Sequence, residues 1–196
     1  MVLARSLGVP ILAIDLEESY LRVLERQADN LGLANKVVTK VGDMADLAEP
    51  KESIDLIWSE GAVYCIGFDK ALINWRPLLK PNGIIACTEL SWLTDKPNSE
   101  PAEFWRTNYP NMRSTEENIH AAHSLGYVCM NSFVLPASCW WDEYYSPMRT
   151  QIASLTTEVA YQPALAYAIE GANKEISLYE KYGDQYGYVF YLLQKI

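Results

Sequence analysis

A short apolar run that ends in a carboxylate constrains the fold of this chain more than any other feature. Val9–Ile14 is wholly apolar, Asp15 follows it, and helical spacing of apolar residues begins at Glu17. This order of strand, acid and helix is typical of a doubly wound α/β sheet, whose ligands sit beyond the carboxyl ends of the strands. A carboxylate there can accept bonds from the two hydroxyls of a ribose, each worth roughly 1.5–3 kcal/mol. The segment therefore predicts a nucleoside-containing ligand, with a helix N-cap as the equally weighted alternative for Asp15.

Composition and charge exclude several classes of protein. The 196 residues, 49% of them hydrophobic, suffice for one domain with a real core, and we expect a single domain over 1–196. No apolar run reaches the length of a membrane span. The net charge of −9 disfavours nucleic acid as a partner, although it is also what ordinary solubility requires. The four cysteines form no CxxC pair, so we expect neither a disulfide framework nor a metal site, and a reducing cytoplasm.

Strand and helix patterns alternate along the chain, which favours an α/β fold with a mostly parallel sheet. The predicted strands are Ile11–Ile14, Lys36–Val41, Ile54–Ser59, Gly83–Leu90, Tyr127–Leu135 and Tyr186–Lys195, the last of them antiparallel. The predicted helices are Glu17–Leu31, Asp69–Leu79, a helix from the capping box Ser114–Glu117 to Gly126, and Pro147–Tyr182, interrupted near Gln162. The predicted irregular segments are the turn Pro81–Gly83, a loop or lid over Ser91–Pro110, and the aromatic stretch Ala137–Tyr145.

Polar residues follow three of the predicted strands and would meet at one edge of a parallel sheet. The first strand is followed by Asp15 and Leu16, the second by Gly42, Asp43 and Met44, and the third ends in Ser59, Glu60 and Gly61. These parts suit an adenosine: Asp15 for the ribose, Asp43 for the adenine amino group, and the two apolar side chains for the faces of the ring. Ser59–Gly61 would then face the rest of the ligand. Alone, Asp43 reads better as a turn residue and Glu60 as a solvated one, but together the three strand ends are more specific.

The same motifs resemble the class I S-adenosylmethionine-dependent methyltransferases. The resemblance covers residues 1–90 and rests on four segments, Ile14–Asp15, Val41–Met44, Ile54–Gly61 and Leu79–Gly83. It implies a Rossmann-like sandwich, S-adenosyl-L-methionine as cofactor, and a small molecule as methyl acceptor. It also assigns Asp15 to the ribose, Asp43 to the adenine, and Ser59–Gly61 to the methionine part and the acceptor. The rest of the chain is similar to one branch of small bacterial enzymes of the menaquinone or ubiquinone type.

The resemblance also implies a first strand and a Gly-rich loop, and the sequence shows neither ahead of Ile11. In the family this strand lies in the middle of the sheet, and its loop supplies backbone amides to the methionine part. We therefore expect a sheet without its first central strand, between Ile11–Ile14 and Ile54–Ser59, in an N-terminally truncated form of the domain. Cofactor binding would then be weak, act mostly through the adenosine half, and leave activity impaired.

Three residues could act as a base on the acceptor, namely Glu60, His120 and His123. Glu60 is the preferred candidate because its strand end borders the predicted cofactor site, whereas the histidines fit an exposed helix face. Six aromatic residues could line an acceptor pocket for a ring or a cationic amine, or could pack the lid on the sheet. They are Trp92, Trp105, Trp140, Trp141, Tyr144 and Tyr145, and at most one of the two adjacent tryptophans would face a ligand.

Two other functions remain as alternatives at this point. A nicotinamide-dependent oxidoreductase also carries an acid after its second strand, but Gly42–Asp43 and Leu79–Gly83 fit it poorly. A methyltransferase-like domain that binds a ligand without turnover would suit a chain without the Gly-rich loop. The expected partner is a small molecule, with nucleic acid and a membrane span excluded and a homo-oligomer left open.

Overall fold

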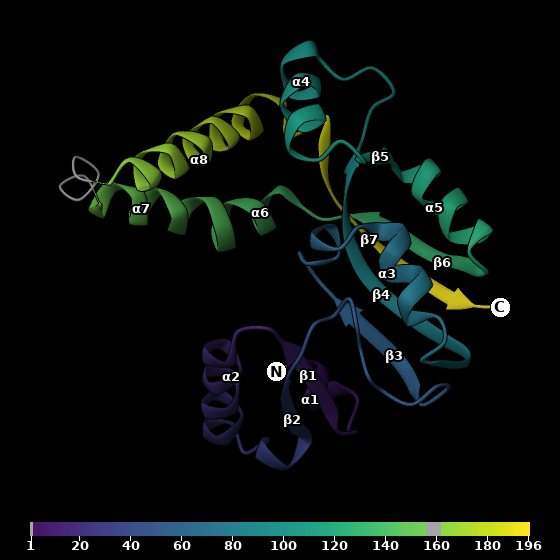
Figure 1. The fold of residues 1–196 in the computed structure, drawn as a ribbon. Helices are drawn as coiled ribbons and strands as arrows, with labels where there is room; N and C mark the ends of the chain where they lie inside the picture. Colours follow the sequence, from purple (N-terminus) through teal and green to yellow (C-terminus); the bar gives the residue numbers. More distant parts are fainter. Residues whose placement is uncertain (1, 156–161) are drawn as a thin grey trace.

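The strands of the computed structural model form two separate sheets flanked by helices (Figure 1). The structure describes residues 2–155 and 162–196. The strands are β1 (Ile11–Asp15), β2 (Val37–Val41), β3 (Ile54–Ser59), β4 (Leu79–Trp92), β5 (Arg113–Ser114), β6 (Tyr127–Val134) and β7 (Tyr186–Lys195). The α-helices are α1 (Val2–Ser6), α2 (Glu18–Asn30), α3 (Phe68–Trp75), α4 (Ser99–Asn108), α5 (Thr115–Ser124), α6 (Ala137–Trp140), α7 (Ser146–Ser154) and α8 (Pro163–Tyr182). Three shorter turns are η1 (Ala34–Lys36), η2 (Val63–Cys65) and the π-helical η3 (Trp141–Tyr145).

The strands of the described residues fall into two sheets, with the division between β2 and β3 along the chain. β1 and β2 pair in parallel, and β3, β4, β7 and β6 follow one another in the second sheet, with β5 paired to β4. Among the described residues no strand joins β1 to β3. β7 is antiparallel to both of its neighbours, so β3, β4 and β6 all run in one direction and β7 alone runs against them. This mixed sheet brings the carboxyl ends of β3 and β4 to a common edge.

The predicted turn at Pro81–Gly83 is an irregularity within β4 rather than a break before it. Ile54 pairs with Leu79, and two residues later Leu56 pairs with Ile84, so β4 carries extra residues at this point. Asn82 has a φ of +62°, which bends the strand. A Cβ at Gly83 would lie 2.9 Å from the Lys80 carbonyl oxygen, so a side chain at this position would clash with the backbone.

Two apolar clusters cover the second sheet. The first lies between the sheet and the helices α3 and α5, and its largest buried members include Phe68, Trp75, Tyr127 and Tyr191. The second lies where β4 ends and β7 begins, and it packs α4, α6, η3 and α8 together through Trp105, Trp140, Tyr145, Tyr179 and Tyr186. Figure 1 shows these helices extending away from the sheet on the side where β4 ends.

Two segments that the sequence predicts as irregular are helical. Ser99–Asn108, within the predicted loop Ser91–Pro110, is α4, and its early Pro101 fits the first turn of a helix. Ala137–Tyr145 forms α6 and η3, because its aromatic side chains pack in the second cluster. In contrast α3 is shorter than predicted: it ends at Trp75, two residues before Pro77.

The predicted ends of α5 are confirmed. Ser114 Oγ accepts the Glu117 N–H at 3.2 Å and Glu117 Oε2 accepts the Ser114 N–H at 2.8 Å, which completes the capping box. Gly126 follows the helix with a φ of +83°. The predicted interruption near Gln162 falls beside residues outside the described part, and α8 begins at Pro163. No described helix is both long enough and apolar enough to cross a bilayer.

Asn118 joins α5 to the buried side of the second sheet. Its side chain is 2% exposed and its Nδ2 donates to Ser91 Oγ at 3.1 Å and to the Tyr191 hydroxyl at 3.3 Å. The same two hydroxyls lie 3.0 Å apart, so the three groups form one buried polar network. Its loss would leave two hydroxyls with fewer partners in an apolar core.

We expect Asn118→Ala to lower the free energy of unfolding by about 1–3 kcal/mol, because a buried donor is lost from this network. The measurement is equilibrium unfolding in urea, with Asn173→Ala on the exposed side of α8 as the matched control. The control should change stability by no more than about 0.5 kcal/mol. Equal effects of the two variants would contradict the role of Asn118.

Candidate functional site

The ends of β1 and β2 are joined by a backbone hydrogen bond. Asp15 pairs with Val41, and the Gly42 N–H donates to the Asp15 carbonyl oxygen at 3.0 Å. The Asp15 side chain accepts the Glu17 N–H at 2.8 Å, while Glu17 itself is the N-cap of α2. Asp15 therefore supports the turn before the helix without being its N-cap. Its second carboxylate oxygen accepts no hydrogen bond from the described residues.

The segment after β2 presents the second predicted acid. Asp43 is exposed and its Oδ1 accepts the Ala45 N–H at 2.7 Å, so it does form the turn that the alternative interpretation expects. Met44 is half-buried and packs against the first cluster, whereas Leu16, across the same edge, is 66% exposed. Of the two apolar side chains predicted to cover the faces of a ring, Met44 is therefore fixed by packing and Leu16 is not.

Helix α3 ties this segment to the second sheet. Trp75 Nε1 donates to the Met44 carbonyl oxygen at 2.8 Å, and Asn74 Nδ2 donates to the Ala45 carbonyl oxygen at 2.7 Å. Trp75 is buried in the first cluster, which also packs against the second sheet. The two sheets are therefore connected through α3.

The third predicted strand end, Ser59–Gly61, is fixed to β4. Ser59 pairs with Cys87, and the Gly61 N–H donates to Thr88 Oγ1 at 2.7 Å. Gly61 has a φ of +61°, which turns the chain toward η2. Glu60 is exposed and accepts a hydrogen bond from Trp58 Nε1. The structure thus places Asp15 and Asp43 on one sheet and Ser59–Gly61 on the other.

Glu89 is a buried carboxyl group that the sequence analysis did not select. It lies two residues beyond Cys87, the partner of Ser59, and so stands past the end of β3. It is 2% exposed; its Oε1 accepts a hydrogen bond from the Tyr109 hydroxyl, and its Oε2 has no partner among the described residues. The signal available in the sequence was a charged residue inside the largely apolar run Gly83–Leu90.

Burial raises the pKa of Glu89 from 4.5 to about 7. The hydrogen bond from Tyr109 and the positive charge of Arg113 lower this pKa, and the negative charge of Asp69 raises it, but the loss of hydration dominates. Near neutral pH the carboxyl group is therefore poised between its two protonation states.

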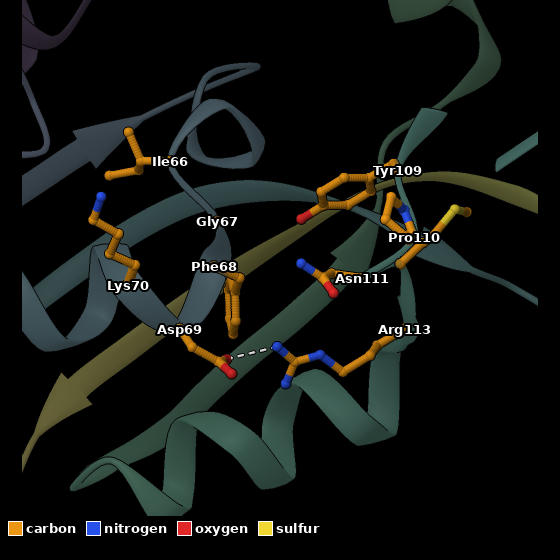
Figure 2. Close-up of a pocket in the computed structure, with 10 residues that line it drawn as sticks. Ile66, Gly67, Phe68, Asp69, Lys70, Tyr109, Pro110, Asn111 and Arg113 are labelled. Atoms are coloured by element: carbon orange, nitrogen blue, oxygen red, sulfur yellow. Dashed lines mark hydrogen bonds and ion pairs between the residues drawn. The ribbon is translucent and has the colours of Figure 1, made fainter. Parts of the chain in front are cut away.

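A cavity of about 480 Å³ lies between the start of α3 and the loop that joins α4 to β5 (Figure 2). Phe68 and Asp69 line one side, and Tyr109 and Arg113 the other. Arg113 Nη2 and Asp69 Oδ1 form an ion pair of 2.7 Å, drawn as the dashed line in Figure 2. Because Tyr109 is both part of the wall and the donor to Glu89, this carboxyl group lies directly behind the wall of the cavity.

The sequence profile of a family described as "Methyltransferase domain" matches residues 2–151. The chain belongs to this S-adenosylmethionine-dependent methyltransferase family. The nicotinamide-dependent oxidoreductase considered from the sequence is therefore wrong. No curated protein sequence matches the chain significantly.

Solved structures of low sequence identity share the methyltransferase fold. A SAM-dependent methyltransferase from Geobacter sulfurreducens in complex with S-adenosyl-L-homocysteine aligns with a TM-score of 0.78 at 19% identity, over 96% of this chain and 76% of that one. The cyclase SpnF aligns with a TM-score of 0.75 at 19% identity, over 99% of this chain and 68% of that one. Geranyl diphosphate C-methyltransferase from Streptomyces coelicolor A3(2) aligns with a TM-score of 0.64 at 14% identity, over 96% of this chain and 63% of that one. These likenesses establish the α/β Rossmann-like fold with a mixed sheet.

The two histidines of this methyltransferase domain lie on a helix surface, and most of the six candidate aromatic residues pack in the second cluster. His120 and His123 are exposed on α5, as the alternative interpretation expects. Trp140 is buried, stacks on Tyr188 with ring centroids 4.8 Å apart, and contacts Tyr179. Its neighbour Trp141 is half-buried with the Arg149 guanidinium 5.3 Å from its ring centre. Among the described residues no cluster of three metal-ligating side chains occurs.

Glu89→Gln should change how stability depends on pH. The pKa of Glu89 is higher in the folded than in the unfolded state, so its contribution to stability is complete below pH 4.5 and is lost as the pH rises through about 7. The amide that replaces the carboxyl group in this variant does not titrate and has no such dependence. The free energy of unfolding of Glu89→Gln, relative to that of the wild type, should therefore rise by on the order of 3 kcal/mol between about pH 5 and about pH 8.

Urea unfolding of both proteins across this pH range measures the effect. Glu116→Gln on the exposed face of α5 is the matched control, and its difference from the wild type should not vary with pH. A pH-independent difference for Glu89→Gln as well would show that Glu89 keeps an ordinary pKa.

Proposed function

We propose that this chain transfers a methyl group from S-adenosyl-L-methionine to a small molecule. The observation that carries the proposal is the junction of β1 and β2, where the Gly42 N–H binds the Asp15 carbonyl oxygen and sets two carboxylates at one edge of a sheet. Membership of the methyltransferase family adds the identity of the nucleoside.

The donor and acceptor groups at this edge fit the adenosine half of the cofactor. Asp15 would accept bonds from the ribose hydroxyls through the carboxylate oxygen that α2 leaves open. Asp43 would accept a hydrogen bond from the adenine amino group, with Leu16 and Met44 beside the ring. A Cβ at Gly42 would lie 3.2 Å from Ile14 Cγ2 and crowd the junction of the two strands.

Ser59, Glu60 and Gly61 would border the methionine half and the acceptor. When bound, the cofactor supplies an activated methyl group on a sulfonium, so the protein mainly has to orient the acceptor. Glu60 is exposed at the end of β3, where it can reach a ligand, and we propose that it orients or deprotonates the acceptor. The hydrogen bond from Gly61 to Thr88 keeps this strand end in place.

The chemistry of the chain favours a small acceptor over a nucleic acid. The net charge of −9 opposes a polyanion, and the 480 Å³ cavity has the size of a small-molecule site. The geranyl diphosphate enzyme with the same fold acts on a small molecule. Likeness to the menaquinone and ubiquinone branch adds a quinol ring to the acceptors worth testing.

Asp15→Asn should weaken binding of S-adenosylhomocysteine about tenfold or more, because the charge that strengthens the ribose bonds is lost while Oδ1 can still accept the Glu17 N–H. Isothermal titration calorimetry measures the change. Asp29→Asn on the exposed side of α2 is the matched control and should bind like the wild type.

Nucleoside analogues locate the effect on the ribose. Adenosine should lose affinity for Asp15→Asn in parallel with S-adenosylhomocysteine, while 2′,3′-dideoxyadenosine, which lacks both hydroxyls, should bind the two proteins alike. Equal losses for both nucleosides would remove Asp15 from the ribose site.

Glu60→Gln should lower kcat for methyl transfer about tenfold or more and change cofactor affinity little, because an interaction with the acceptor acts mainly in the transition state. The measurement is transfer from labelled S-adenosylmethionine to a panel of small amines, phenols and a naphthoquinol, with transfer RNA and duplex DNA in parallel. Glu116→Gln serves as the control. Faster transfer to either nucleic acid than to the panel would contradict the proposed acceptor class.

A further inference from the structure

Glu89 has one carboxylate oxygen without a hydrogen-bond donor, although it is buried. Native proteins satisfy nearly all buried polar groups, so such an oxygen calls for an explanation. Its partner oxygen is bound by Tyr109, and its neighbour Thr88 already accepts the Gly61 N–H on the other face of β4. The side chain is thus oriented from one side and lacks a donor on the other.

The position of Glu89 places it next to the predicted methyl-acceptor site. It stands just past the end of β3, one strand away from Glu60, and behind the wall of the 480 Å³ cavity. Ligands of parallel α/β sheets bind beyond such strand ends. Figure 2 shows Tyr109 reaching from the loop after α4 toward the Gly67–Phe68 side of the cavity.

No described cation neutralises Glu89 directly. Arg113, the cation that faces it from β5, forms its ion pair with Asp69 instead. Figure 2 shows the amino group of Lys70 directed away from this pair. An aromatic wall completes the surroundings, since Tyr64 contacts Tyr109 edge-on with ring centroids 6.4 Å apart. A carboxylate beside tyrosine rings is the combination that recognises an organic cation.

We propose that Glu89 and Tyr109 form a binding site for a protonated amine, whose N–H group donates to Glu89 Oε2. The proposal rests on the proposed function and names its acceptor class: a small amine that fits the cavity, binds as an alkylammonium, and can receive a methyl group at nitrogen only after its N–H proton has passed to Glu89. Tyr109 acts as a positioning residue, because its hydroxyl holds Glu89 Oε1 and leaves Oε2 without a donor. The site needs the ionised form of Glu89.

Several titratable or charged groups surround this carboxylate, and their elements differ. They are Tyr109 after α4, Asp69 on α3, Arg113 on β5, Tyr188 and Tyr191 on β7, and Cys87 on β4. Burial raises the pKa of Tyr109, Tyr188, Tyr191 and Cys87, so none of these four ionises near neutral pH. Asp69 and Arg113 form an ion pair with each other. Glu89 is therefore the group around this site that changes charge near pH 7.

The test uses two probes of the same shape on the full chain, without cofactor. N,N-dimethylethanolamine is protonated and carries an N–H donor, and 3-methylbutan-1-ol replaces that nitrogen by carbon. Ligand-observed NMR titration should show the amine binding about tenfold or more tightly than the alcohol. Choline, a cation without an N–H, should bind between the two. Equal binding of the amine and the alcohol would overturn the proposal.

Two variants assign the binding to Glu89. Glu89→Gln should lose the preference for the amine, and the exposed Glu116→Gln should keep it. In the wild type the affinity for the amine should rise as the pH increases through about 7, where Glu89 ionises, while the probe itself stays protonated. Tyr109→Phe should move the midpoint of this rise to higher pH, because the hydrogen bond from Tyr109 lowers the pKa of Glu89.

Undiminished preference in Glu89→Gln, equal losses in both glutamate variants, or a flat pH dependence would each contradict the proposal. A parallel titration with S-adenosylhomocysteine separates this inference from the proposed function. In the wild type, absence of amine selectivity together with intact nucleoside binding rejects the amine site alone. Absence of nucleoside binding with intact amine selectivity rejects the proposed function alone.

Discussion

Two hydrogen bonds from α3 support the arrangement of the whole candidate site. Trp75 and Asn74 donate to the carbonyl oxygens of Met44 and Ala45, and so connect the small β1–β2 sheet to the larger one. In the described part of the chain the two sheets share no strand ladder, so this connection and the packing of Met44 and Leu47 on the first cluster take over its task. Each bond is individually modest, but both are donated to carbonyl oxygens of the turn that presents Asp43. The geometry of the nucleoside edge therefore depends on a helix that belongs to the other sheet.

Neighbouring polar residues near the end of β4 make contacts on opposite faces of the sheet. Thr88 points to one face and fixes Gly61, while Glu89 points to the other and meets Tyr109. This alternation follows from the period of two in a strand. Keeping a carboxyl group in a nearly water-free place costs stability, and the raised pKa of Glu89 is the measure of that cost. A stable protein without a use for it could replace Glu89 by an apolar residue.

The sequence predicts those parts of the fold whose signals are local. The acid after β1, the capping box at Ser114 and the antiparallel last strand follow from short patterns and are present in the structure. The helix α4 lies within a segment predicted as a loop, and its Pro101 stands in the first helical turn, where proline is tolerated. The Glu89–Tyr109 contact could not be predicted, since it joins residues on different elements whose packing is not encoded in either segment. The roles of the strand-end residues toward a cofactor remain predictions.

The π-helical turn η3 has a consequence for the length of the chain. Trp140 and Tyr145 are five residues apart, yet their rings stack 5.5 Å from each other and both contact Tyr179. An α-helix turns about 100° per residue, so residues five apart would point in different directions, whereas the wider π turn brings them to one face. Removal of one residue between them would restore ordinary winding and leave the two rings four positions apart, a spacing that an α-helix also places on one face. The π turn thus accommodates one additional residue between the two rings while both keep their contact with Tyr179.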